Sequence, residues 1–199
     1  MDAKGWPDHA LKKGRRQMGQ AFAVWLTGPP ASGKSAIAKV LKERVANAGL
    51  VVEVLESDLL RRIVTPEPTY SLEERELFYR SLAFFGSRMV AHGISVIFDA
   101  TAHRRLYRNL ARASIPHFLE VSIVCPIEVR RQRDHKGIYK LAAEGKTTTV
   151  PGLQEPYEPP DAAELEIDTT AVTPERAADH VMGALEQRGY LTSARADAE

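Results

Sequence analysis

Short apolar runs alternate with helix-like segments along most of the chain. Runs of strand length cover residues 21–27, 50–55, 94–98 and 118–124, and a shorter run covers 165–167. Between these runs, apolar residues recur at helical spacing. Buried strands that alternate with helices are typical of an α/β fold, in which a parallel sheet carries helices on both faces. The pattern therefore predicts three layers and a sheet of about five strands.

The segments between the runs predict the helices. Residues 36–48 form the first, and Gly49 ends it. Ser71 is the expected N-cap of a second helix that stops at Gly93. Further helices are expected over 104–113, 126–134 and 137–143, and Thr173 caps a last one. The inward face of the helix after Ser71 is predicted to hold Leu77, Phe78, Leu82, Phe85 and Met89.

One glycine-rich loop lies between the first strand and the first helix. Residues 28–35 read Gly-Pro-Pro-Ala-Ser-Gly-Lys-Ser, which matches the phosphate-binding pattern G-x-x-x-x-G-K-[ST]. Strand, loop and helix in this order predict the P-loop NTPase fold. Backbone N–H groups and the helix N-terminus would hold the phosphates, Lys34 would reach the β- and γ-phosphates, and Ser35 would bind Mg²⁺. The predicted ATP-binding residues are Gly28, Ala31, Ser32, Gly33, Lys34, Ser35 and Ala36.

Acidic residues follow two of the other strands. Asp58 comes just after the second strand, and Asp99 ends the third. Residues at the carboxyl ends of parallel strands face the ligand crevice. We therefore expect Asp58 to be a catalytic carboxylate, with capping of the next helix as the alternative. Asp99 is either a residue of the active site or a turn residue that bonds its own backbone.

A phosphate-binding loop alone does not separate kinases from other nucleotide hydrolases. The chain lacks an Asn-Lys-x-Asp segment of the kind that reads guanine. Residues 145–160 are rich in proline and glycine and predict a long irregular segment. An acidic group, downstream arginines and a segment able to close over the site are the parts that a small kinase needs.

Composition restricts the compartment and the kinds of partner that the protein could have. Hydrophobic residues make up 44% of the chain, and the formal net charge is +1, so bulk charge favours no nucleic-acid partner. Cys125 is the single cysteine, expected to be a packing residue, and it excludes an internal disulfide. No apolar run approaches the roughly 20 residues that span a bilayer. We expect a cytoplasmic protein with a small-molecule substrate and no membrane partner. Residues 1–20 are expected to be a flexible arm, 21–191 the kinase domain with a lid at about 133–160, and 192–199 a tail.

Three further motifs carry a resemblance to a known family. Residues 133–140 read Arg-Asp-His-Lys-Gly-Ile-Tyr-Lys, residues 152–159 read Gly-Leu-Gln-Glu-Pro-Tyr-Glu-Pro, and residues 164–169 read Glu-Leu-Glu-Ile-Asp-Thr. Together with the phosphate loop, they resemble the adenylylsulfate kinase (APS kinase) family over roughly residues 20–190. The lid and Pro-Tyr-Glu motifs are more specific than the loop.

The resemblance implies an activity and a set of roles. These enzymes use ATP and Mg²⁺ to phosphorylate the 3′-hydroxyl of adenosine 5′-phosphosulfate, and they are often dimers, which makes a homodimer the expected assembly. By position, Asp58 matches a base that also organises Mg²⁺, and Arg61 and Arg75 match arginines of the acceptor side. Lys136 matches a lid lysine near the transferred phosphate, and Arg133 matches a lid arginine near ATP.

The departures from the family fall on the acceptor side. Tyr70 keeps an aromatic surface, but Phe78 stands where the family has an asparagine and is as well explained by core packing. Thr101 belongs to a segment that replaces Ile-Ser-Pro, and Val150 replaces a phenylalanine that stacks on the acceptor. Asp99-Ala-Thr101 is also similar to a segment of polynucleotide-kinase-like enzymes. A different hydroxyl acceptor, or a nucleotide-binding domain without turnover, therefore remains as an alternative.

Two groups downstream of Asp99 have two interpretations each. His103 is either an acceptor contact or a residue without a role in the site. Arg104, Arg105 and Arg108 favour a solvated helix face over an anion site.

Overall fold

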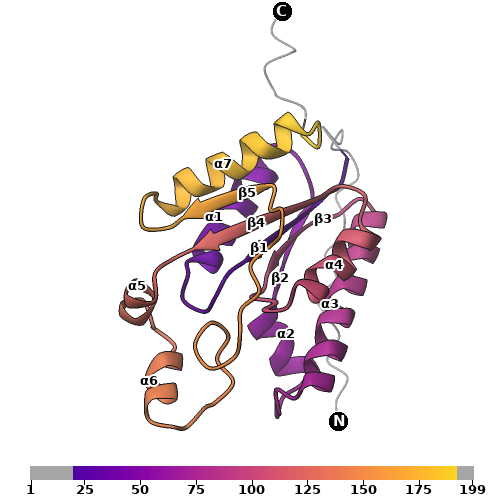
Figure 1. Cartoon of the computed structure of the whole chain (residues 1–199). Helices are drawn as coiled ribbons and strands as arrows, with labels where there is room; N and C mark the ends of the chain where they lie inside the picture. Colours follow the sequence, from indigo (N-terminus) through magenta and orange to yellow (C-terminus); the bar gives the residue numbers. More distant parts are fainter. Residues whose placement is uncertain (1–19, 192–199) are drawn as a thin grey trace, which may run out of the picture.

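The structure is a computed structural model that describes residues 20–191 (Figure 1). All but the last residue of the predicted arm at 1–20, and the predicted tail at 192–199, lie outside the described residues. The division of the chain into arm, kinase domain and tail therefore stays a prediction.

A parallel sheet forms the centre of the described chain. Its five strands are β1 (Ala23–Thr27), β2 (Val52–Glu56), β3 (Ser95–Asp99), β4 (Phe118–Val124) and β5 (Leu165–Asp168). They lie in the order β2-β3-β1-β4-β5, and every neighbouring pair is parallel. The predicted α/β fold with about five parallel strands is confirmed.

Helices cover both faces of this sheet (Figure 1). The described helices are α1 (Lys34–Asn47), α2 (Ser57–Val64), α3 (Leu72–Ala91), α4 (Arg105–Ser114), α5 (Ile127–Gln132), α6 (Ile138–Ala143) and α7 (Pro174–Gln187). Helices α1 and α7 pack together over one hydrophobic cluster, and α3 and α4 pack together over the other. The predicted N-caps are confirmed, because Ser71 and Thr173 each accept a hydrogen bond from a first-turn N–H. Residues 145–160 contain no helix or strand, as predicted.

The buried face of α3 differs from the predicted one. Phe78 and Leu82 are buried, but Leu77 is 61% exposed and Phe85 is 44% exposed. The prediction for these two residues was wrong, since the buried residues of the helix instead include Tyr79, Ala83 and Gly86.

Gly86 allows α3 to approach the sheet closely. A Cβ atom at this position would lie 2.2 Å from the Cζ atom of Phe98. The Phe98 ring cannot retreat easily, because it stacks on Trp25 with 4.4 Å between ring centroids. A small residue in α3 is therefore a packing requirement of the core.

Arg108 of α4 is a second correction. The sequence favoured a solvated arginine, but this side chain is fully buried. Its guanidinium donates to Glu120 Oε1 at 2.5 Å, to the Glu158 carbonyl at 2.8 Å and to the Ala102 carbonyl. Arg108 therefore joins α4 to β4 and to the Pro-Tyr-Glu segment, and these partners compensate its burial.

The arrangement of the strands decides where a site can form. Asp99 of β3 lies in register with Leu26 of β1 and with Glu56 of β2. The loop after β1, the start of α2 and the chain after β3 consequently meet at one edge of the sheet. None of the described helices has the combination of length and apolar content that crossing a membrane requires.

Candidate functional site

The phosphate-binding loop follows directly from β1. Gly28 has φ +155°, and a Cβ atom there would lie 2.5 Å from the Ile123 carbonyl oxygen, so glycine is required. Gly33 is the N-cap of α1 with φ +100°, a conformation that favours glycine. The loop thus turns sharply out of the sheet and directs the N-terminus of α1 toward the same space, as anion binding requires.

Lys34 lies inside the loop. Its Nζ atom donates to the carbonyl oxygens of Gly28 and Pro29, each at 2.9 Å. Burial lowers the pKa of Lys34 to about 8, although the nearby carboxylates of Asp99 and Asp58 act to raise it. The ammonium group is therefore preorganised at the phosphate site and responds to nearby negative charge.

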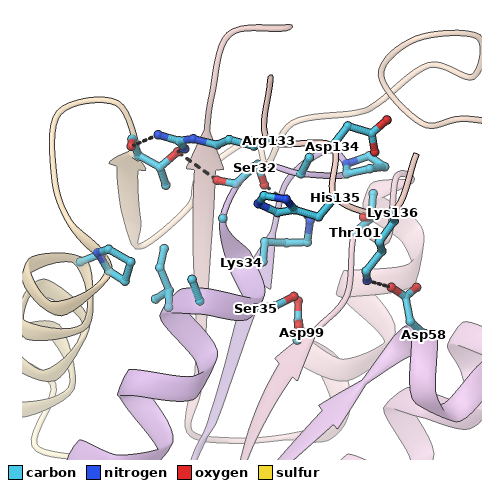
Figure 2. A pocket seen from close by; sticks show the side chains of 18 of the residues that line it. Ser32, Lys34, Ser35, Asp58, Asp99, Thr101, Arg133, Asp134, His135 and Lys136 are labelled. Carbon is cyan, nitrogen blue, oxygen red and sulfur yellow. Dashed lines mark hydrogen bonds and ion pairs between the residues drawn. The ribbon is translucent and has the colours of Figure 1, made fainter. Parts of the chain in front are cut away.

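A cavity of about 730 Å³ opens over this loop (Figure 2). Strand ends and the following turns contribute Asp58, Asp99 and Thr101, and the segment after β5 completes the wall. The structure thereby brings together most of the predicted site. The predicted residues that line the cavity are Ala31, Ser32, Gly33, Lys34, Ser35, Ala36, Asp58, Thr101, Arg133 and Lys136.

The predicted lid is attached to the loop by residues that sequence reasoning did not assign. Arg133 donates to the hydroxyl and carbonyl oxygens of Thr169 at 3.1 Å each, and the Thr169 hydroxyl donates to the Ser32 carbonyl at 2.9 Å. The Tyr139 hydroxyl donates to the Pro30 carbonyl at 3.0 Å. Both residues lie in the motifs that carried the family resemblance, which was the available signal.

Two predicted catalytic side chains contact each other at one side of the cavity (Figure 2). Lys136 of the lid forms an ion pair with Asp58 at the start of α2. Each side chain is more than half exposed, so the pair contributes little to stability. The position of this ion pair is more informative, because it places a carboxylate and an ammonium group side by side in the cavity that the phosphate loop lines.

Five of the predicted acceptor residues do not line this cavity and lie together beside one another: Arg61, Tyr70, Arg75, Phe78 and Val150. The Arg61 guanidinium lies 3.9 Å from the centroid of the Phe78 ring, and Arg75 donates to the Tyr70 and Thr149 carbonyls at 3.0 and 2.9 Å. Phe78 and Val150 are buried. The Arg61 guanidinium covers the Phe78 ring, which favours core packing, the other interpretation of this residue. The roles of Phe78 and Val150 in acceptor binding stay predictions.

His103 lies beside this cluster and is 3% exposed. Its Nδ1 atom has no hydrogen-bond partner among residues 20–191. Burial lowers the pKa of His103 to about 4, and the positive charges of Arg75 and Arg104 lower it further in the same direction. The imidazole is therefore neutral at physiological pH, and its role in acceptor binding stays a prediction.

Comparison with known proteins identifies the relatives of this arrangement. A family model described as adenylylsulphate kinase matches residues 20–168. A probable adenylyl-sulfate kinase of Pyrococcus abyssi is 32% identical over 172 residues, which cover 86% of this chain and 99% of that protein. A probable adenylyl-sulfate kinase of Archaeoglobus fulgidus is 36% identical over 149 residues, with 75% and 96% covered.

Solved structures agree with the sequence comparisons. The APS kinase of Mycobacterium tuberculosis in complex with AMPPNP and APS superposes with a TM-score of 0.79 at 28% identity, over 84% of this chain and 99% of that one. Shikimate kinase from Aquifex aeolicus reaches a TM-score of 0.52 at 15% identity and shares the fold alone.

Proposed function

The chain belongs to the adenylylsulphate kinase family of phosphotransferases, and we propose that it transfers the γ-phosphoryl group of ATP to the 3′-hydroxyl of adenosine 5′-phosphosulfate. The observation that carries this proposal is one cavity that unites the phosphate loop with Asp58, Arg133 and Lys136. Donor binding, acceptor activation and charge neutralisation each have a candidate group there.

The donor half of the site is formed by the loop and the lid. Loop N–H groups and the N-terminus of α1 provide positive potential for the phosphates. Lys34, held by two loop carbonyls, needs only to exchange those acceptors for phosphate oxygens. Arg133 approaches from the lid side, where Thr169 fixes its guanidinium. These contacts favour a triphosphate that lies along the loop.

The donor atoms of the cavity fit Mg²⁺. The sequence assigns the metal to Ser35 and Asp58; both line the cavity, and so does a second carboxylate, that of Asp99. No group of three or more His, Cys, Asp or Glu side chains suited to a metal occurs among residues 20–191. Mg²⁺ is usually held by one or two protein groups together with phosphate oxygens and water, so this donor set suits it. Bound there, the ion would neutralise charge on the β- and γ-phosphates.

Asp58 and Lys136 are the groups proposed for the acceptor. Asp58 would accept a hydrogen bond from the acceptor hydroxyl and orient it for in-line attack. Lys136 would leave its ion pair with Asp58 and move toward the transferring phosphoryl group. Closure of the lid (residues 133–160) over the cavity would exclude water and favour transfer to the alcohol over hydrolysis.

An acceptor screen with ATP tests the proposal. ADP release would be measured with adenosine 5′-phosphosulfate, with adenosine 5′-monophosphate as the matched compound without sulfate, and with small alcohols. We expect release above background with the first compound. Release only with another acceptor, or with none, would overturn the proposed substrate. In parallel, Asp58→Ala should abolish turnover and retain AMPPNP binding; turnover that persists would remove Asp58 from the mechanism.

The assembly and the location of the protein remain proposals. We propose a homodimer in the cytoplasm, and the apolar residues that α3 exposes, Leu77 and Phe85 among them, are compatible with a partner surface. Light scattering on the purified protein measures the mass directly; a mass of one chain at micromolar concentration would contradict the dimer.

A further inference from the structure

A second carboxylate lies in the cavity, at the end of strand β3, which lies between β2 and β1. Asp99 is 8% exposed and lines the same cavity as Lys34 and Ser35. Ile97, two residues earlier, belongs to the core cluster beneath α1, so the alternation along a strand directs Asp99 to the face of the sheet where α1 begins. Figure 2 shows Asp99 below Ser35 in that view.

Asp99 has no polar partner within residues 20–191. Its carboxylate takes part in no hydrogen bond and no ion pair there, although its charge is the strongest of those that act to raise the pKa of Lys34. The alternative role as a turn residue requires a bond to nearby backbone, and the described chain contains none. The Asp99 carboxylate is largely buried by the protein but lines the cavity, which leaves it open to a ligand there. It gains free energy when a cation binds beside it.

Asp58 differs from Asp99 in its exposure and in its partner. Asp58 is more than half exposed and is paired with Lys136. It lies at the start of α2, whereas Asp99 lies in register between β1 and β2. The two carboxylates therefore suit different tasks, one deep beside the loop hydroxyl and one at the open side of the cavity.

We propose that Asp99, together with Ser35, holds the Mg²⁺ of the ATP complex, either directly or through a metal-bound water, and that Asp58 serves the acceptor hydroxyl. The inference rests on the proposed function for its ATP donor and is independent of which alcohol is phosphorylated. One buried carboxylate and one hydroxyl leave room for the phosphate oxygens and waters that Mg²⁺ retains.

Nucleotide binding with and without metal tests this assignment. Calorimetry would give the Kd of AMPPNP for the wild-type protein, for Asp99→Asn and for Asp58→Asn, each with Mg²⁺ and with EDTA. The ratio of the two Kd values measures the coupling between metal and nucleotide. Asp58→Asn is the matched control, because it removes the other carboxylate of the same cavity.

The proposal predicts that Asp99→Asn reduces the coupling by about 10- to 100-fold, as losses of carboxylates around metal sites do. Asp58→Asn should keep the coupling close to that of the wild type. Metal-free AMPPNP should bind Asp99→Asn at least as tightly as the wild type, since a carboxylate that repels phosphate has been removed. A residue needed only for folding would instead weaken both affinities.

Three results would overturn the assignment. These are a wild-type ratio near one, an Asp99→Asn ratio equal to that of the wild type, and loss of coupling in Asp58→Asn alone. If Asp99→Asn does not fold, as judged by circular dichroism, Asp99→Ser takes its place with the same readout. Because no acceptor is present in these measurements, failure of the proposed substrate cannot produce any of these results.

Discussion

Replacement of Arg108 by methionine should destabilise the protein strongly. The substitution keeps an unbranched, apolar side chain, shorter than that of arginine, and removes the charge and every donor. Glu120 would lose its 2.5 Å partner, and the Ala102 and Glu158 carbonyls would lose theirs. Glu120 is itself buried and, among residues 20–191, would retain only Arg112, at 2.9 Å, as a side-chain partner of its carboxylate. The variant therefore leaves buried polar groups without compensation.

The size of the effect follows from these contacts. Removal of one member of a buried ion pair costs about 3–5 kcal/mol. For a domain of this size, such a loss lowers Tm by roughly 6–20 °C. Arg105 provides the matched control on the same helix, because its side chain is 41% exposed where it pairs with Glu158 and Asp161. Arg105→Met should change the free energy of unfolding by less than about 1 kcal/mol.

Equilibrium unfolding in guanidinium chloride measures both variants, with equal m-values as the check that the same transition is compared. Adding Glu120→Gln to Arg108→Met should recover at least about 1 kcal/mol, because it neutralises the carboxylate left behind. If Arg108→Met destabilises no more than Arg105→Met, or if the second substitution recovers nothing, the reasoning about this buried network is refuted.

Further predictions concern the core, the loop and the lid. Gly86→Ala should destabilise by about 1–3 kcal/mol, because its Cβ atom would overlap a core ring. Gly183→Ala in α7, where the added Cβ meets nothing within 4 Å, should stabilise the protein by about 0.5–1 kcal/mol. If both variants shift Tm in the same direction in thermal unfolding, the proposed packing of Gly86 is contradicted. AMPPNP binding should take up protons at pH 8.5 and not at pH 6.5, because the pKa of Lys34 is about 8 and bound phosphate raises it. Calorimetry in buffers of different ionisation enthalpy measures this proton uptake. Equal uptake at both pH values would count against the role of Lys34. Lys136→Met should leave the free energy of unfolding within about 1 kcal/mol yet lower kcat about 100-fold. The exposed ion pair between Lys136 and Asp58 contributes little to stability. If steady-state kinetics give an unchanged kcat, Lys136 takes no part in the chemical step.

The parts of the fold that the sequence predicted are those that depend on local patterns. Strand runs, helix spacing and the caps at Ser71 and Thr173 are short-range signals, and the structure contains them. The inward face of α3 was predicted less well, because Leu77 and Phe85 are apolar in a place where no element of the described chain covers them.

The residues of the site likewise divide into those that are contiguous in the sequence and those that only folding brings together. The phosphate loop is contiguous, so its residues were named from the sequence. Arg108 was not recognised as buried, because its partners lie at residues 102, 120 and 158 and only the folded chain brings them together. Thr169 contacts Ser32 across 137 positions; the family motif marked its segment, but no local pattern indicates which residue it contacts.

The most direct test of the central claim is ³¹P nuclear magnetic resonance of a reaction of this protein with ATP, Mg²⁺ and adenosine 5′-phosphosulfate. We expect a new phosphomonoester signal that couples to the ribose 3′-proton and grows as the γ-phosphate signal of ATP declines. An unchanged acceptor spectrum in the presence of active, nucleotide-binding protein would contradict it, and so would a phosphoryl group on any other atom.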